Sequence, residues 1–540
     1  MSGSKSSQGG AFSNRRLRRR ATPPVDEFLE VKAEWLNDGS LLDRVGMHCV
    51  EVFMREPDDS FTRWVGPGKL TVSSMCSGCE FPLLTSASLT RAMAMHHAEE
   101  LLQLEVQDSC EIDPKKQRFI KRLHYLDMDP DDHAPLVGGP CLFPDTRLLN
   151  KRHTWCLFHK NNCSTANGDI IIIGFSCKDI SRANPGHKEA DLSQSSSSGG
   201  SCDTFQSLLL RIDSSDDPPC LLIVENVDAL SDTDGNEKSN LDLVIAELSN
   251  RGYECKAVIA DSSEFAVPQR RRRIYIVGIR LASRRFDFTR WGVEDTFQTW
   301  SSVMSSLRMA TCNIDEVLLP DSHPWVQASL RWAIDHVPRE VEKTWLDLHM
   351  SFYKEKKLHW PVKAPSAERS CLWWTAVPHR EQDIIATTHK IMRKNLPSLC
   401  DSSQNIFITP FSSKRTTANG MEVEVSPTAM PGARWWHLKR LRYVTGEEKL
   451  CVQGFPTRKP ELKVLMDETD DQTAHKLGGD AFTGTVVLVV KWALIRACPW
   501  VAERKTPVVS DETMQRALAA LSASSSSSSS SRQPGKRPRR

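Results

Sequence analysis

The sequence predicts an α/β protein with a doubly wound, mostly parallel sheet, a smaller irregular lobe and disordered basic tails. Two observations carry this prediction. Short apolar runs alternate with helix-like segments between residues 69 and 280, and the alternation stops between 291 and 440. Apolar runs of this kind are typical of parallel strands that helices cover on both faces. The 540 residues also exceed the size of one typical core, so we expect two or more lobes.

The expected elements can be followed in order along this first part of the chain. Asn240 is expected to cap a helix that ends before Gly252, because an Asn side chain can accept hydrogen bonds from free backbone N–H groups. The expected strands lie at 70–75, 170–175, 221–227, 254–259 and 273–279, another strand ends at 109–113, and the expected helices lie at 91–104 and 241–250.

Both ends of the chain are rich in Ser, Gly and basic residues. The sequence NRRLRRR occupies 14–20, and the chain ends in a serine run followed by GKRPRR. We expect both ends to be disordered, since such segments cannot bury a core. The basic clusters indicate nuclear import or contact with DNA, so we expect a nuclear protein. An organellar transit peptide is a weaker alternative. For the N-terminal cluster, a tail that only increases solubility is an equally good alternative.

Charge, hydropathy and cysteine content exclude several classes. With 70 Lys+Arg against 68 Asp+Glu the net charge is +2, so attraction to nucleic acid must come from local patches. The apolar stretches at 170–175 and 486–495 are shorter than the ~20 residues of a membrane-spanning helix. The N-terminus has no apolar signal region, and 16 scattered cysteines favour reduced thiols inside a cell. We therefore expect a soluble protein without disulfides.

The residues that follow the apolar runs are the candidate site, because ligands bind beyond the carboxyl ends of strands in open parallel sheets. A tight turn, Cys76–Cys79, follows the first strand, Glu111 the second and Asp145 a third. A carboxylate after the second strand suits the hydroxyls of a ribose. The run at 170–175 leads directly to Cys177. A cysteine there is more often a small buried apolar side chain, so the surrounding motifs decide its role.

The segment Gly174–Ser181 resembles the catalytic cysteine loop of the cytosine-5 DNA methyltransferases, and four further blocks follow in that family's order. Residues 222–227 resemble its Glu-Asn-Val strand, 268–278 its Gln-x-Arg-x-Arg strand, 451–456 its Leu-Gln-Gly-Phe-Pro segment and 478–482 its closing Gly-Asn-x block. Five blocks in one order are far more specific than one. The resemblance implies a class I, Rossmann-like methyltransferase that takes its methyl group from S-adenosylmethionine and acts on double-stranded DNA.

The chemistry of cytosine methylation suits the residue types in these blocks. Carbon 5 of cytosine is a poor nucleophile, so a thiolate, here that of Cys177, must first add to carbon 6. Glu225 can share a proton with ring nitrogen N3 as charge develops there. The resemblance puts Arg273 at the base carbonyl O2, with Gln269 and Arg271 in support. The predicted catalytic residues are Cys177, Glu225, Asn226, Arg271 and Arg273.

The resemblance also implies a cofactor site, and the chain departs from the family's pattern near it. Ser176 stands where Pro is usual before the nucleophile, and Cys76 stands in place of an aromatic residue. Asp480 stands where Asn is usual, which brings an extra negative charge toward the methionine part of the cofactor. The predicted cofactor-binding residues are Cys76, Ser77, Gly78, Glu111, Ile112, Asp145, Asp480 and Ala481.

Composition and motifs together divide the chain into five segments. The expected segments are an N-terminal extension with a basic tail (1–65), a catalytic domain (66–290), a target-recognition lobe rich in Trp, Pro and His (291–440), a segment that returns to the catalytic domain (441–505) and a Ser-rich basic tail (506–540). Arg270 and Arg272 are expected to point away from the site, since side chains alternate along a strand.

Three alternatives stay open at this level. Cys76 and Cys79 with Cys156, His159 and Cys163 could form a zinc site, but the two halves lie about eighty residues apart in the sequence, and we assign no metal. The family's RNA branch, a tRNA cytosine methyltransferase, shares the core blocks but has a Cys-Phe-Thr signature that this chain lacks. A non-catalytic DNA-binding homologue is the third alternative. Retention of Cys177 and Glu225 argues against it.

Overall fold

The computed structural model describes residues 31–498 with short gaps. The gaps are 56–67, 77, 97–101, 126–138, 185, 188–190, 194–198, 234–237, 282–291, 337–342, 356, 360–361, 365, 396–403 and 410–420. Both basic tails, 1–24 and the end of the chain, lie outside the described residues. The expectation that they are disordered therefore stays a prediction.

A seven-stranded sheet forms the centre of the larger lobe, in the order β3-β2-β1-β6-β7-β9-β8. Neighbouring strands run parallel except β9, which is antiparallel to both β7 and β8. The predicted doubly wound, mostly parallel sheet is confirmed. The strands are β1 (Gly68–Met75), β2 (Leu102–Cys110), β3 (Cys141–Phe143), β6 (Ile170–Gly174), β7 (Leu221–Val227), β8 (Tyr253–Asp261) and β9 (Arg272–Arg280).

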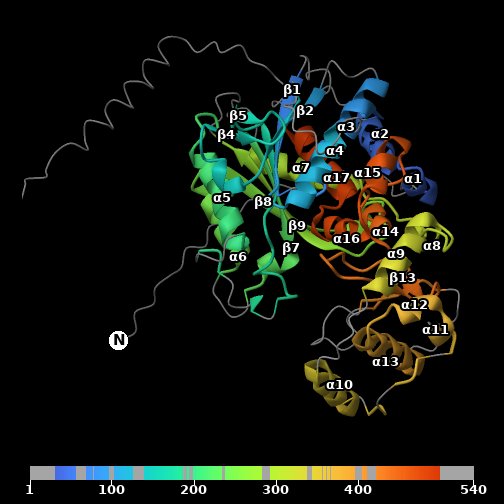
Figure 1. Ribbon diagram of the computed structural model, residues 1–540. Helices are drawn as coiled ribbons and strands as arrows, with labels where there is room; N and C mark the ends of the chain where they lie inside the picture. Colours follow the sequence, from blue (N-terminus) through green and yellow to red (C-terminus); the bar gives the residue numbers. More distant parts are fainter. Residues whose placement is uncertain are drawn as a thin grey trace, which may run out of the picture.

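Apolar side chains on both faces of the sheet explain why the strand sequences are continuously hydrophobic. Ile170 and Ile172 of β6 belong to one core cluster, whereas Ile171 and Ile173 belong to the other. Such alternation follows from the two-residue period of a strand. One face is covered by α5 (Ser201–Asp213) and α6 (Asn240–Ser249), and the opposite face by α3 (Phe81–Met95) and α17 (Gly484–Ala497) (Figure 1).

Helices from both ends of the described chain complete the second of these faces. α2 packs on α3 and α17, and α17 also packs on α7. The 31–55 segment therefore belongs to the core around the sheet. The remaining helices of this lobe are α1 (Ala33–Asn37), α2 (Leu41–Arg55), α4 (Pro114–His124), α7 (Val293–Ser306), α14 (Gly446–Cys451), α15 (Lys463–Asp467) and α16 (Asp471–Asp480).

The smaller lobe has its own apolar core, centred on Trp373, Trp374, Trp436 and Tyr443. It lies at one end of the molecule, below the sheet in Figure 1. An antiparallel four-stranded sheet, β11-β10-β12-β13, packs with its helices. Its elements are α9 (Pro324–Asp335), α10 (Lys343–Glu355), α11 (Ser366–Ser370), α12 (Leu372–Thr375), α13 (His379–Asn395), β10 (Ile406–Ile408), β11 (Met421–Val423), β12 (Trp436–His437) and β13 (Arg442–Tyr443). The short helix α8 (Ile314–Val317) packs on α1 of the larger lobe instead.

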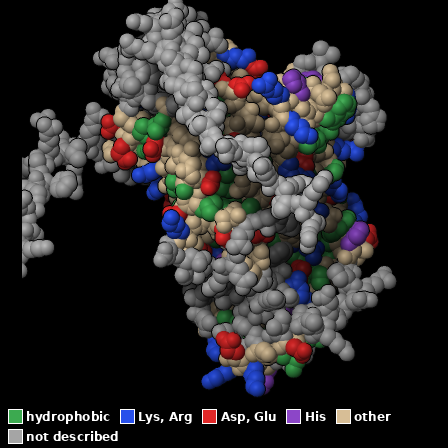
Figure 2. All heavy atoms as spheres, turned by 90° about the vertical axis from the view of Figure 1, so that its left-hand side faces the viewer, with side chains coloured by type: hydrophobic (Ala, Val, Ile, Leu, Met, Phe, Trp, Pro, Cys, Tyr) green, Lys and Arg blue, Asp and Glu red, His purple; other side chains and the backbone are tan. Residues whose placement is uncertain are grey.

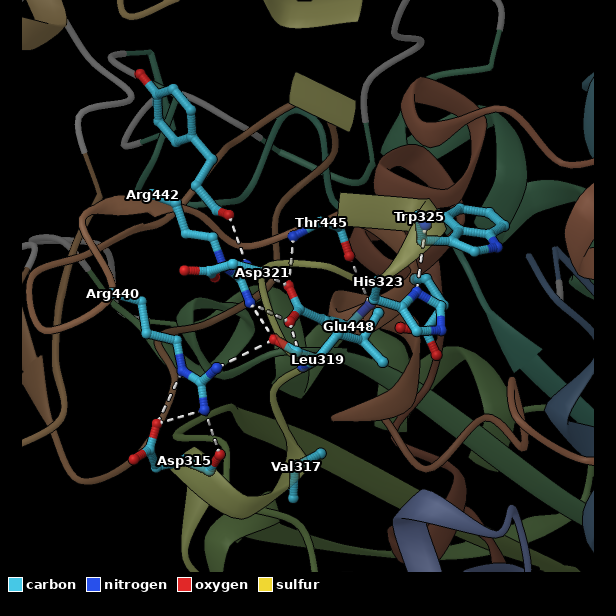
Figure 3. A network of polar contacts seen from close by, with 12 residues as sticks. Asp315, Val317, Leu319, Asp321, His323, Trp325, Arg440, Arg442, Thr445 and Glu448 are labelled. Atoms are coloured by element: carbon cyan, nitrogen blue, oxygen red, sulfur yellow. Dashed lines mark hydrogen bonds and ion pairs between the residues drawn. The ribbon is translucent and has the colours of Figure 1, made fainter. Parts of the chain in front are cut away.

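A buried polar network joins the two lobes where the chain passes from β13 to α14 (Figure 3). The Arg442 guanidinium donates to both carboxylate oxygens of Glu448, at 2.9 and 2.8 Å, and to Asp321 and the Leu319 carbonyl. Arg442 and Glu448 are both fully buried. Glu448 also closes the capping box of α14 by accepting from the Thr445 N–H.

Two local predictions differ from the structure. The helix expected at 91–104 begins at Phe81 and ends at Met95, and Leu102–Leu104 belong to β2, because the apolar residues there pack as a strand beside β1. The cap of α6 is Ser239, not Asn240. The Ser239 hydroxyl accepts from the Asp242 N–H at 3.2 Å, and the Asp242 carboxylate accepts from the Ser239 N–H at 2.8 Å.

One stretch, 471–497, is long and apolar enough to cross a membrane by length and composition alone. The structure packs it into the protein interior, with 94% of its most apolar window buried. The core helix of a globular domain passes the same test, and α17 lies between α2, α3 and α7 in this way.

Candidate active site

The loop that carries Cys177 is held in place by hydrogen bonds to its neighbours. It begins at Gly174, the last residue of β6. The Ser176 N–H donates to the Thr204 hydroxyl of α5 at 2.9 Å, and the Asn226 amide donates to the Phe175 carbonyl at 2.9 Å. The loop is thus tied to a helix on one side and to β7 on the other. Asn226 acts through the backbone of this loop.

A second tie connects the far end of the loop to the first turn of α5. The Asp179 carboxylate accepts from the Ser201 N–H at 2.7 Å, and the Ser201 hydroxyl accepts from the Asp179 N–H at 3.1 Å. A carboxylate is favourable at a helix N-terminus, where backbone N–H groups have no partner within the helix. Cys177 therefore lies between two loop residues, Ser176 and Asp179, that are both hydrogen-bonded to α5.

Glu225 and Arg273 face each other beside this loop. In the antiparallel pair β7 and β9, Glu225 is opposite Tyr275, so Arg273 lies two residues along on the same face. The Arg273 Nε and a Glu225 carboxylate oxygen are 3.1 Å apart, and the side chains are only 12% and 11% exposed. The two predicted base-binding groups therefore form a shielded ion pair at the end of the sheet.

The Cys177 thiol has a pKa above its ordinary value. Burial is the main cause, and the negative charge of Glu225 adds to it. The positive charges of Arg273 and Arg271 act in the opposite direction and offset part of the rise. At neutral pH the resting Cys177 side chain is therefore a thiol. It must lose its proton when the substrate base binds.

Arg271 is buried, and its guanidinium donates hydrogen bonds to backbone carbonyls. It donates to Ala429 at 2.7 Å and to Ala481 at 2.7 Å. Burial lowers the pKa of Arg271 to about 10. In this arrangement Arg271 holds the backbone at Ala429 and Ala481, and it is a positioning residue beside the site.

The side chains of Arg270 and Arg272 point away from the site, as expected. Arg270 and Arg272 are each 58% exposed and lie near Glu422 and Asp228. Gln269 is fully buried, and neither polar atom of its carboxamide has a hydrogen-bond partner. Buried polar groups without partners are costly, so Gln269 is available to a group that enters this region.

The predicted cofactor residues gather at the carboxyl ends of β1, β2 and β3. The Glu111 carboxylate accepts from the N–H groups of Gly78, Ile112 and Asp113 at 3.0–3.3 Å. Burial raises the pKa of Glu111 above its ordinary value. Asp145 follows β3 and accepts from the Arg147 guanidinium, so its pKa lies below the ordinary value even though burial alone would raise it.

The turn after β1 approaches the closing block of the sequence. Cys76 and Gly78 have positive φ angles of 54° and 65°. A Cβ atom on Gly78 would lie 3.2 Å from the Asp480 carbonyl and 3.5 Å from the Ala481 Cα, so glycine allows this contact. The turn after β1 and the closing block thus lie side by side, although they are about 400 residues apart in the sequence. Ser77 lies outside the described residues.

Lys116 is a member of this group that the motifs did not predict. It lies in the first turns of α4, and its amine pairs with the Asp480 carboxylate at 2.7 Å. Although burial alone would lower it, the pKa of Lys116 lies above the ordinary value because Glu111 and Asp480 are both negative. Lys116 therefore balances the extra charge that Asp480 brings. Its position five residues after Glu111 is the signal that could have revealed it.

The zinc alternative takes a different form from the one considered above. Cys156, His159 and Cys163 do come together, but the fourth member is Cys141, and neither Cys76 nor Cys79 joins them. Cys79 is fully buried next to the turn after β1.

The surface carries charges of both signs. On the face in Figure 2, Lys and Arg side chains alternate with Asp and Glu over the part that the structure describes. This agrees with the net charge of +2.

Comparisons with known proteins relate the chain to one group. A family model described as C-5 cytosine-specific DNA methylase matches residues 153–482. DNA (cytosine-5-)-methyltransferase DMT5 of Cryptococcus neoformans var. grubii is 26% identical over 514 residues, 90% of this chain and 20% of that protein. Type II methyltransferase M.NgoFVII of Neisseria gonorrhoeae is 32% identical over 128 residues, 24% of this chain and 31% of that protein.

The chain spans about a fifth of the length of the Cryptococcus protein. Among solved structures, the S. pombe Dnmt2 methyltransferase aligns with a TM-score of 0.39 and 13% identity, over 79% of this chain and 98% of that one.

Proposed function

Because the chain belongs to the C-5 cytosine-specific DNA methylase family, we propose that it transfers a methyl group from S-adenosylmethionine to carbon 5 of a cytosine flipped out of double-stranded DNA. The observation that carries this proposal is the meeting of Cys177 with the ion pair of Glu225 and Arg273 at the ends of β6, β7 and β9. A nucleophile, an acid and a fixed cation at one place are the groups that this reaction needs.

Cys177 opens the reaction by adding to carbon 6 of the base. The thiol loses its proton, a sulfur–carbon bond forms, and the electron pair of the C5–C6 double bond moves to carbon 5. Negative charge also develops on N3 and O2 of the ring. Arg273 donates to O2, and Glu225 shares a proton with N3 as charge develops there. Carbon 5 then takes the methyl group, and S-adenosylhomocysteine leaves. Transfer of the carbon 5 proton to a water molecule expels the Cys177 thiolate and restores the ring.

The shielded position of the ion pair supports this assignment. Glu225 and Arg273 hold one another in the free protein at 3.1 Å, so both are already oriented when the base arrives. A preoriented donor in a site with little water stabilises developing charge more than the same group in water does. The unpartnered carboxamide of Gln269 can add a hydrogen bond to the entering nucleotide.

The residues at the ends of β1 to β3 suit S-adenosylmethionine. Glu111 can accept the ribose hydroxyls, the exposed Ile112 offers an apolar face to the adenine, and Asp145 can accept from its amino group. Gly78, Asp480 and Ala481 lie together where the methionine part would extend. When bound there, S-adenosylmethionine supplies the methyl group as an electrophile.

Replacement of Cys177 by Ser tests the proposal. The hydroxyl is nearly isosteric but a far weaker nucleophile, so tritiated-methyl transfer to duplex DNA should fall to background while DNA binding is retained. Cys255→Ser, on β8 and away from the site, is the matched control and should keep full activity. Near-normal turnover by Cys177→Ser would refute the covalent route.

A mechanism-based substrate gives an independent measurement. DNA that contains 5-fluorocytosine should form a denaturation-resistant adduct with the active protein, because fluorine cannot leave as the proton does. The adduct should be absent with Cys177→Ser and present with Cys255→Ser. A parallel assay with tRNA separates the DNA substrate from the RNA alternative, since methyl transfer to tRNA alone would contradict the proposal.

A nuclear location remains part of this proposal and depends on the basic clusters at the two ends of the chain. Both lie outside the described residues. Deletion of 1–24 and of the last six residues, followed by imaging of a fluorescent fusion, checks it, with exclusion from the nucleus as the expected result.

A further inference from the structure

Three cysteines and a histidine form a compact group at the edge of the main sheet, away from the reacting residues. Cys141 begins the edge strand β3, Cys156 ends β4 (His153–Cys156), and Cys163 lies in β5 (Asn161–Ser164). His159 is in the turn between β4 and β5. The ligand atoms of all four residues lie within 4.8 Å of one another.

The distances in this group match tetrahedral metal coordination. The His159 Nδ1 lies 3.5, 3.4 and 3.3 Å from the sulfurs of Cys141, Cys156 and Cys163. A zinc ion with Zn–S bonds of about 2.3 Å and Zn–N bonds of about 2.0–2.1 Å holds a sulfur and a nitrogen about 3.6 Å apart in a tetrahedron. One atom at the centre of the four would therefore reach all of them.

A metal-free explanation accounts less well for the same geometry. One ring nitrogen carries either one N–H or one lone pair, so His159 Nδ1 can satisfy only one of the three sulfurs. The described cysteines form no disulfide, although these three sulfurs are close together. Apolar packing would explain a buried cysteine but not the convergence of three sulfurs on one nitrogen.

The turn between β4 and β5 is shaped to present two of the ligands. The His159 N–H points to the Cys156 sulfur at 3.4 Å, and the Lys160 N–H donates to the Cys156 carbonyl at 3.0 Å. Lys160 has a positive φ of 49°, which lets the chain turn back into β5 within four residues. Backbone N–H groups that point to a sulfur favour its thiolate form, which is the form that binds metals.

We propose that Cys141, Cys156, His159 and Cys163 bind one structural zinc ion. Three sulfurs and one imidazole fill a tetrahedral shell and leave no position for water or substrate, as in other closed zinc sites. The ion fastens the β4–β5 hairpin to the edge strand β3. That hairpin otherwise meets the sheet through the Leu157 N–H, which donates to the Leu142 carbonyl at 2.8 Å, and through the buried ring of Phe158.

The experiment measures metal in the full-length protein purified without a metal-affinity tag and dialysed against a mild chelator. Elemental analysis should find one zinc per chain. His159→Ala should lose the zinc, whereas His159→Cys should retain it because a fourth sulfur completes the shell. The control Cys255→Ser should also retain it. Cobalt substitution should give the absorption bands of a tetrahedral cobalt–thiolate site in the wild type and in His159→Cys.

Alkylation of the wild-type protein decides the matter even if the variants fail to fold. With zinc bound, Cys141, Cys156 and Cys163 should resist alkylation, and removal of the zinc by a strong chelator should expose all three together. Wild-type protein without zinc would overturn the proposal. Zinc that stays bound while these three cysteines are freely alkylated would overturn it as well.

Discussion

Ser176 shows what the sequence could and could not reveal at the scale of single residues. The motif predicted Cys177 as the nucleophile, and a Ser in place of the usual Pro implied a less restrained loop. The structure shows a different restraint, because the Ser176 N–H donates to the Thr204 hydroxyl. A proline nitrogen cannot donate. Thr204 lies 28 residues away on α5, and no pattern in the sequence marks it as the partner of this loop.

Removal of that partner should slow the reaction without abolishing it. Thr204→Val leaves the Ser176 N–H without an acceptor, at a local cost of about 1–3 kcal/mol. We expect turnover to fall roughly tenfold, since each 1.36 kcal/mol at the transition state is a factor of ten. Single-turnover methyl transfer measures this directly.

A second substitution separates this explanation from a general loss of packing. Ser176→Pro in the Thr204→Val background removes the unsatisfied N–H and should restore much of the lost rate. If the double variant loses as much rate as the two single variants combined, the hydrogen bond is not what positions Cys177.

At the scale of helices and strands, the motifs predicted the sheet better than the segments between its strands. β6 and β7 were recognised because they are apolar on both faces, which only a central parallel strand requires. The end of α3 and the start of β2 were not separated, since apolar residues near 102–104 suit either element. The group around His159 was found in part. Cys141 was missed because it comes from a three-residue strand with no neighbouring cysteine.

Lys491 in the core helix α17 gives a prediction about stability. Its amine is fully buried and donates to the hydroxyls of Thr85 and Ser86, both at 2.8 Å, and among the described residues it has no carboxylate partner. Burial therefore lowers the pKa of Lys491 well below its ordinary value of 10.5. The amine is charged in the unfolded chain at pH 7, and burial disfavours that charge, so the lowered pKa costs folding stability about 1.4 kcal/mol per unit of pKa depression.

Lys491→Met should raise the free energy of unfolding at pH 7 by about 1 kcal/mol or more, as it removes that cost. As the pH rises toward 10.5 the unfolded state binds fewer protons, so the wild type becomes more stable. The difference in free energy of unfolding between the variant and the wild type should therefore narrow. Urea denaturation at pH 6 to 9 measures it. Lys476→Met, at an exposed position of α16, should show no such pH dependence. A gap that stays constant with pH would contradict the explanation.

At the scale of the whole molecule, the Arg442–Glu448 pair holds the smaller lobe to the core (Figure 3). Removal of one member of a buried pair leaves the other charge uncompensated and costs about 3–5 kcal/mol. We expect Glu448→Gln to destabilise the protein by about 3 kcal/mol and to loosen the smaller lobe first, which limited proteolysis would detect. Asp467→Asn, which breaks the exposed pair with Lys463, should cost less than about 1 kcal/mol.

The same pair predicts a dependence on acid. Although burial would raise it, the pKa of Glu448 lies below the ordinary value of 4.5 because of the charge and hydrogen bonds of Arg442. Its contribution is therefore complete above pH 4.5 and is lost as the pH falls through the lower, folded-state pKa. The stability difference between wild type and Glu448→Gln should shrink below pH 4. A difference that grows in acid would show that Glu448 is not ionised in the fold.

The distance along the chain between α17 and the helices it covers matters for biosynthesis. The amine of Lys491 and the hydroxyl of Thr85 are 406 residues apart. At about 5–20 residues per second, translation takes on the order of 20–80 s to pass from one to the other. During this interval the apolar faces of α2 and α3 are not yet packed against α17, so we expect the nascent chain to bind chaperones. The core can close only after the ribosome has released the last described helix.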